Sequence, residues 1–75
     1  MRDTVIKIIG DINDEIFAHC ECDLLESGII DSFDIFNIVV ELECQFNIEV
    51  PAELIIPNNF RRIDNIVMML EEIVS

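Results

Sequence analysis

Residues 28–46 read GIIDSFDIFNIVVELECQF, and this stretch decides the fold of the chain. At about 100° per residue, the period of a helix, one side of the stretch gathers apolar side chains: Ile35, Val39, Leu42 and Phe46. The opposite side gathers polar ones: Asp34, Asn37, Glu41 and Gln45. The pattern predicts an amphipathic helix. A second apolar stripe either widens its buried face or stays exposed: Phe33, Phe36, Val40 and Cys44.

Ser32 stands where this helix begins, between Asp31 and Asp34. Short polar side chains at a helix start accept hydrogen bonds from the first free backbone amides. We therefore expect Ser32 to be the N-cap and Asp31 to lie just outside the helix. A lone hydroxyl between two acids at this position also suggests a modification site.

The rest of the chain predicts an all-α fold, a small four-helix bundle of three main helices and one short helix. The first main helix follows Asp3 or Thr4 as its cap, and its inward face is Val5, Ile8, Ile9, Ile12 and Ile16. Asp64 is expected to cap the last helix, whose inward face is Ile66, Val67, Leu70, Ile73 and Val74. No convincing strand pattern appears, although residues 47–50 are expected to be briefly extended.

The connections between these helices carry their own signals. A long connection from about His19 to Asp31 contains apolar residues that should pin it to the bundle: Leu24, Leu25, Ile29 and Ile30. Gly28 permits a sharp approach to Ser32, so we expect this loop to be ordered. After a turn at residues 47–51, Asn58 or Asn59 is expected to cap the short helix near Phe60.

Size and charge limit what the chain can do. Its 75 residues, 52% of them hydrophobic, provide one small core, so residues 1–75 are expected to form a single domain. Sixteen acidic and four basic side chains give a net charge of −12. This charge repels nucleic acid and anionic membranes and favours partners with basic patches. No apolar stretch approaches the roughly 20 residues that span a bilayer.

The three cysteines, Cys20, Cys22 and Cys44, cannot all pair within one chain, and no secretory leader precedes them. We therefore expect a reducing cytoplasm. His19 beside a Cys-x-Cys pair lacks the paired spacing of a structural zinc site, so no metal is expected. Nucleophilic catalysis by Ser32 would need a base, and the one histidine lies across a loop, so we expect no enzyme.

The region around Ser32 resembles the phosphopantetheine-dependent carrier proteins, a family of acyl, peptidyl and D-alanyl carriers. Residues 24–34, LLESGIIDSFD, look like the family's attachment signature, an Asp-Ser pair followed by an apolar residue. Supporting matches follow in residues 41–43, at Phe46 and in residues 47–51, NIEVP. The resemblance covers nearly the whole chain. Asn37, where many carriers have an acid, is a departure, and residues 28–30 and 57–60 look more like D-alanyl carriers and carriers from specialised gene clusters, so the resemblance leaves the cargo open.

The resemblance implies an acyl-carrier-protein-like fold and a function. The chain would carry an acyl or aminoacyl intermediate as a thioester on a 4'-phosphopantetheine arm attached to Ser32. A phosphopantetheinyl transferase would move the arm from coenzyme A, and Asp31 would support that transfer. The positive end of a helix suits the phosphate of such an arm, whereas the charges of Asp31 and Asp34 oppose it.

The resemblance also implies partners. A loading ligase and downstream enzymes of fatty acid, polyketide, peptide or cell-wall modification pathways would act on a monomeric carrier. The surface expected to recognise them is Phe33, Asp34, Asn37, Val40, Glu41, Glu43 and Glu49. The alternative function is an unmodified acidic helical module that binds a basic protein.

Overall fold

A computed structural model describes residues 1–18 and 22–74 of the chain. Three α-helices form within them, α1 (Arg2–Ile12), α2 (Ser32–Phe46) and α3 (Ile63–Val74). Three short 3₁₀ segments connect them, η1 (Asp14–Phe17), η2 (Ala52–Leu54) and η3 (Pro57–Phe60). The described ranges contain no strand, so the all-α prediction is confirmed. The predicted count of four helices is not confirmed, because η3, a 3₁₀ segment, lies where the short helix was expected.

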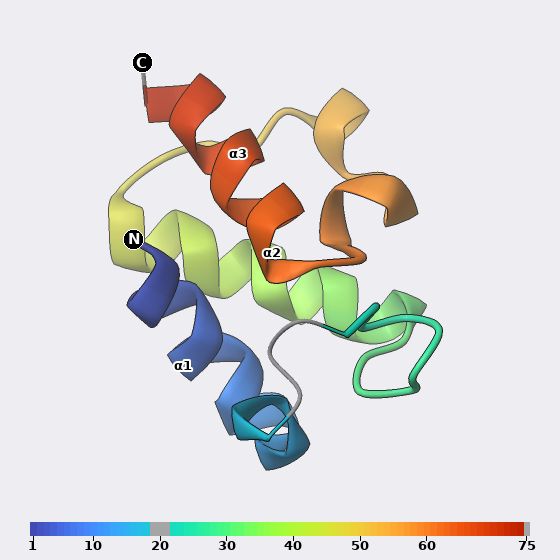
Figure 1. The fold of residues 1–75 in the computed structure, drawn as a ribbon. Helices are drawn as coiled ribbons and strands as arrows, with labels where there is room; N and C mark the ends of the chain where they lie inside the picture. The colour runs from blue at the N-terminus through green and yellow to red at the C-terminus, as the bar shows by residue number, and fades with distance from the viewer. Residues whose placement is uncertain (19–21, 75) are drawn as a thin grey trace.

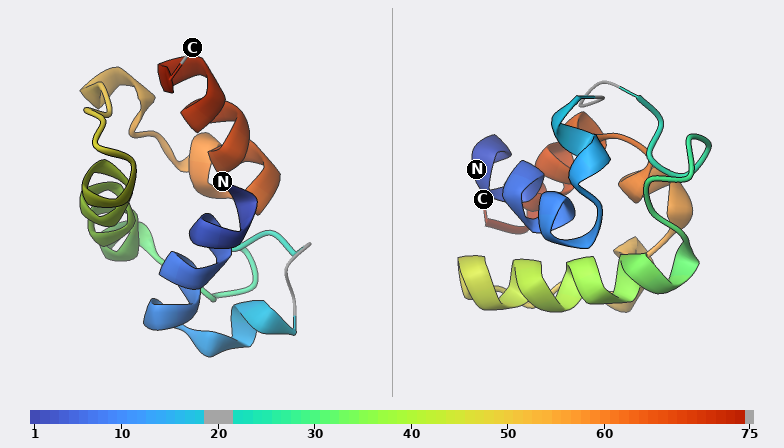
Figure 2. Two further views of the ribbon diagram at one scale, coloured as in Figure 1. Left: turned by 90° about the vertical axis from the view of Figure 1, so that its left-hand side faces the viewer. Right: turned by 90° about the horizontal axis from the view of Figure 1, so that it is seen from below.

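The helices α1 and α3 both lie on one side of α2 (Figure 1; Figure 2). α1 contacts both α2 and α3. The segment η3, which lies between α2 and α3 in the chain, also contacts both of these helices. Fully buried apolar side chains fill the space between them, among them Ile9, Leu42, Phe60 and Leu70. The face of α2 that points away from α1 and α3 is left to solvent.

The first helix is shorter than its apolar pattern suggests. α1 ends at Ile12 because Asn13 takes an extended backbone, with φ −152° and ψ 110°. The Asn13 side chain accepts a hydrogen bond from the Glu15 amide at 3.0 Å and so begins η1, which still buries Ile16. α1 begins at Arg2, so the prediction that Asp3 or Thr4 caps it is wrong.

Two other predicted caps are also wrong. α3 begins at Ile63, which places Asp64 in its first turn, where it pairs with Arg2 and ties α3 to α1. Asn58 and Asn59 lie inside η3, whose start is set instead by Pro57, a residue whose fixed φ suits the first helical position.

Candidate functional site

The described part of the connection before α2, residues 22–31, is fixed to the core. Leu24, Ile29 and Ile30 are buried, and the Ile30 amide donates to the Leu24 carbonyl oxygen at 3.1 Å. Gly28 has a φ of +82°, a conformation that glycine adopts without the penalty that a Cβ brings. These apolar residues therefore pin residues 22–31 to the core, as predicted, and the segment leads directly into the start of α2.

Asp23 holds the beginning of this segment. Its Oδ1 accepts hydrogen bonds from the amides of Leu25 at 3.1 Å and Glu26 at 2.9 Å, and its Oδ2 lies 3.3 Å from Nη1 of Arg61. The Glu26 amide is the main cause of a lowered pKa of Asp23; burial acts in the other direction, and Arg61 lowers the pKa further. Asp23 was not among the residues predicted from the sequence, although an aspartate that opens a turn is a known signal for this geometry.

The N-cap of α2 is Asp31, so the prediction that Ser32 caps the helix is wrong. Asp31 has an extended backbone, and its Oδ1 accepts the amides of Phe33 at 2.9 Å and Asp34 at 3.0 Å. The Asp34 carboxylate in turn accepts the Asp31 amide at 3.0 Å, which completes a reciprocal capping box. Asp31 caps as well as serine does, and its position just outside the first helical residue gives it this role.

Ser32 is therefore the first residue of α2, and its hydroxyl has no capping duty. The residue is exposed, and its hydroxyl makes no hydrogen bond within residues 1–18 and 22–74. It lies at the positive end of a 15-residue helix, a place that favours a phosphate group. Only one oxygen of Asp31 is used by the cap, which leaves Oδ2 without a hydrogen-bond partner in the same ranges. The residues present thus fit a phosphodiester on Ser32.

A row of exposed apolar side chains runs along α2 from this start. Phe33 is 79% exposed, Phe36 62% and Val40 61%, although each is large enough to be expected in a core. We call these three residues the α2 apolar stripe. The sequence predicted surface roles for Phe33 and Val40 but not for Phe36, whose spacing of three and four residues from them was the available signal.

The predicted acidic and polar surface residues do not all lie together. Asn37 and Glu41 are exposed beside the stripe, whereas Asp34 takes part in the capping box. The Glu43 carboxylate turns to the chain beyond the helix and accepts the Val50 amide at 2.9 Å. Glu49 is exposed, but it follows the far end of α2, roughly 20 Å of helix away from Ser32.

The residues that were weighed as metal ligands lie partly outside the described ranges. His19 and Cys20, weighed as metal ligands, are not among the described residues. In residues 1–18 and 22–74, no three His, Cys, Asp or Glu side chains are grouped so as to hold a metal ion. The helices within those ranges are too short or too polar to cross a membrane.

Several known proteins similar to this chain are D-alanyl carrier proteins. A D-alanyl carrier protein of Latilactobacillus sakei is 29% identical over 75 residues, 97% of this chain and 96% of its own. D-alanyl carrier proteins of Enterococcus faecalis and Streptococcus suis are 36% identical over 54 residues and 34% over 53, with 69% and 67% of their own lengths covered. No protein-family model matches. These relatives, together with the site geometry, establish that the chain belongs to the family of phosphopantetheine-dependent carrier proteins.

Proposed function

We propose that this protein carries an acyl or aminoacyl group as a thioester on a 4'-phosphopantetheine arm attached to Ser32. The observation that carries the proposal is the Ser32 hydroxyl, which is exposed, unbonded within the described chain and placed at the first residue of α2. Because Asp31 accepts the capping hydrogen bonds, a modification of Ser32 leaves them in place.

The attachment step is a substitution at phosphorus. The Ser32 oxygen forms a bond to the phosphorus that bears pantetheine in coenzyme A, the pyrophosphate P–O bond breaks, and adenosine 3',5'-bisphosphate leaves. The hydroxyl proton goes to a base on the transferase. We assign the free Oδ2 of Asp31 the task of supporting this transfer by orienting coenzyme A, since Oδ1 is held by two amides.

A transferase assay tests the attachment. The purified protein is incubated with coenzyme A and a phosphopantetheinyl transferase of broad specificity, and its intact mass is measured. We expect a gain of one phosphopantetheine on the native chain and none on Ser32→Ala. Ser27→Ala is the matched control, because Ser27 is an exposed serine in the loop that leads to Ser32, and this variant should keep the full mass gain. No gain on the native chain would favour an unmodified interaction module, and an equal gain on Ser32→Ala would place the modification on another residue; either result would refute an arm on Ser32.

For the cargo, the relatives, which are D-alanyl carrier proteins, favour a D-alanyl group over a fatty acyl or polyketide group. The test uses the arm-bearing protein, D-alanine, ATP and the D-alanine-activating ligase of Latilactobacillus sakei, again with intact mass as the readout. We expect the mass to rise by one alanyl group, and hydroxylamine to remove it as it removes thioesters. If the arm-bearing protein stays unloaded, D-alanine is refuted as the cargo that this ligase attaches. The proposal of an arm on Ser32 is not affected by that result.

The partner enzymes are proposed to dock on α2. The α2 apolar stripe offers them contact area, and the exposed carboxylate of Glu41 beside it attracts basic patches. Small apolar anchors surrounded by charge give fast association and easy release, which a shuttle between several enzymes needs. Phe36 belongs to this surface, together with Phe33, Asn37 and Val40.

A further inference from the structure

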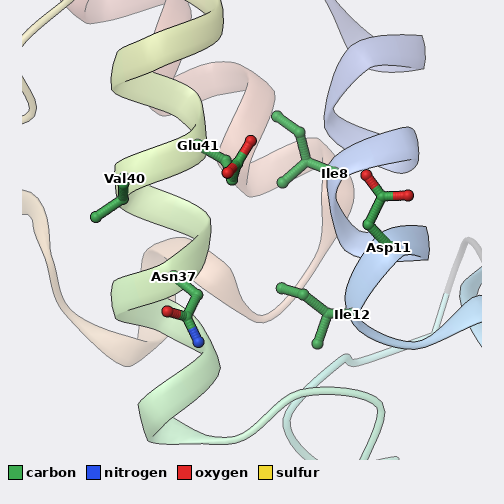
Figure 3. A pocket seen from close by; sticks show the side chains of 6 residues that line it. All are labelled: Ile8, Asp11, Ile12, Asn37, Val40 and Glu41. Atoms are coloured by element: carbon green, nitrogen blue, oxygen red, sulfur yellow. The ribbon is translucent and has the colours of Figure 1, made fainter.

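A groove of about 330 Å³ lies between α1 and α2 (Figure 3). Six residues line it, Ile8, Asp11 and Ile12 from α1 and Asn37, Val40 and Glu41 from α2. Figure 3 shows the Glu41 side chain reaching from α2 toward α1 with Ile8 across from it, and Ile12 further along, across from Asn37. The volume is at the small end for ligand sites in proteins, so the groove suits a side chain rather than a whole cofactor.

The lining combines apolar walls with two uncommitted negative charges. Within the described chain, the carboxylates of Asp11 and Glu41 make no hydrogen bond and no ion pair. Lys7, one turn before Asp11 on α1, forms no ion pair with it, and Arg61 is paired with Asp23. The protein's own cations therefore do not neutralise this groove.

An arginine side chain has the complementary chemistry. Its three-carbon stem is apolar and packs along side chains such as Ile8, Ile12 and Val40, while its charged head stays at the polar rim. The guanidinium group has five N–H donors in a planar fork, so it can bond more than one acceptor. Asp11 and Glu41 offer carboxylates from two different helices, and Asn37 adds an amide to the same lining.

The ammonium group of an aminoacyl cargo is a less suitable occupant because of where the arm begins. At 100° per residue, Asn37 lies about 140° and Glu41 about 180° around α2 from Ser32. Glu41 is also about 13 Å further along the helix axis. An arm from Ser32 would have to cross the exposed face of α2 to enter the groove, whereas a docked partner already covers that face.

We propose that the α1–α2 groove is a socket for one arginine side chain of a partner protein docked on α2. Val40 belongs both to the α2 apolar stripe and to the groove, so a partner seated on the stripe places a neighbouring side chain over the socket. The socket adds α1, through Ile8, Asp11 and Ile12, to the recognition surface. That the partner is an enzyme acting on a carrier rests on the proposed function, but the socket itself needs no arm.

An NMR titration tests the socket directly. The ¹⁵N-labelled full-length chain without an arm is titrated with N-acetyl-arginine amide at low salt, and in parallel with N-acetyl-citrulline amide, a neutral molecule of the same shape. We expect saturable shifts concentrated at the groove residues with the arginine compound, and at least several-fold weaker binding of the citrulline compound. Asp11→Asn and Glu41→Gln should each weaken the arginine binding about 2- to 5-fold, the range of an exposed ion pair.

Glu71→Gln is the matched control, because it removes one charge from an exposed position of α3 outside the groove and should leave the binding unchanged. Shifts spread evenly over the acidic surface, equal binding of the two compounds, or equal behaviour of Glu41→Gln and Glu71→Gln would overturn the socket. The same titration on Ser32→Ala should match the native chain. Failure of the transferase assay with an intact titration would therefore refute the arm and not the socket, and the reverse result would refute only the socket.

Discussion

Because Asp31 caps α2 and Ser32 does not, alanine variants at these two neighbouring positions should differ in stability. In Asp31→Ala, the amides of Phe33 and Asp34 lose their acceptor, and the carboxylate of Asp34 remains with half of the capping box. In Ser32→Ala, no hydrogen bond within the described chain is lost, and alanine is the residue with the highest helix propensity. The first variant should be destabilised and the second should not.

The size of the effect follows from the cap. Replacing an aspartate cap by alanine costs about 1 kcal/mol, in a range of roughly 0.5–2 kcal/mol. In a domain of this size, about 1 kcal/mol lowers the melting temperature by roughly 4–8 °C. Ser32→Ala should change the free energy of unfolding by less than about 0.5 kcal/mol, as exposed substitutions without a special role do.

Chemical denaturation followed by circular dichroism measures both variants. Asp31→Asn is the control, because asparagine keeps a capping oxygen while it removes the same charge as alanine does, so it should stay close to the native stability. A loss of 1 kcal/mol or more in Ser32→Ala, with Asp31→Ala near native, would refute the capping assignment. It would also remove Ser32→Ala as a clean control for the transferase assay.

Three other perturbations have defined outcomes. The pKa of Asp23 is lower in the folded chain than its ordinary 3.8. The ionised Asp23 carboxylate therefore stabilises the fold fully above pH 3.8, and this contribution is lost as the pH falls through the pKa of the folded chain. In denaturation curves at falling pH, the difference in stability between the native chain and Asp23→Asn should shrink accordingly. Gly28→Ala places a Cβ at a φ of +82° and should cost about 1–2 kcal/mol, although space around it is open, while Gly28→Asn should cost less; equal losses by denaturant titration would contradict this. The net charge of −12 predicts that moderate salt or divalent cations raise the melting temperature, and a melting curve that does not change with salt would count against self-repulsion.

Helical periodicity predicted the buried faces well because it depends on repeated local spacing. Ile35, Val39 and Leu42 are buried, and so are Val5 and Leu70, as the spacing indicated, whereas Val74, expected on the inward face of α3, is exposed. Helix ends were predicted less well because one residue decides them. Asp31 and Ser32 are both good caps, and only the way that the loop enters α2 settles which residue has the extended backbone.

The site was predictable where it depends on one helix and not where it depends on two. Phe33 and Val40 are exposed on α2, in agreement with their predicted place on its surface. The α1–α2 groove joins Asp11 to Glu41, and no spacing within one helix shows which flank a second helix will approach. For the same reason the bond from Val50 to Glu43 had no signal in the sequence.

The division of roles between Asp31 and Ser32 also determines what attachment of the arm does to the fold. Because the capping bonds end on Asp31, a phosphodiester on Ser32 breaks none of them, and its charge gains from the helix dipole what it loses to the nearby acids Asp31 and Asp34. The forms with and without the arm should therefore melt within about 2–4 °C of each other, which corresponds to roughly 0.5 kcal/mol. Under the proposed function, both forms would present the same α2 apolar stripe, and a loading enzyme would have to tell them apart by the arm itself. A melting temperature shifted by 8 °C or more on attachment, measured by calorimetry on the two forms in one buffer, would show that Ser32 takes part in holding the helix after all.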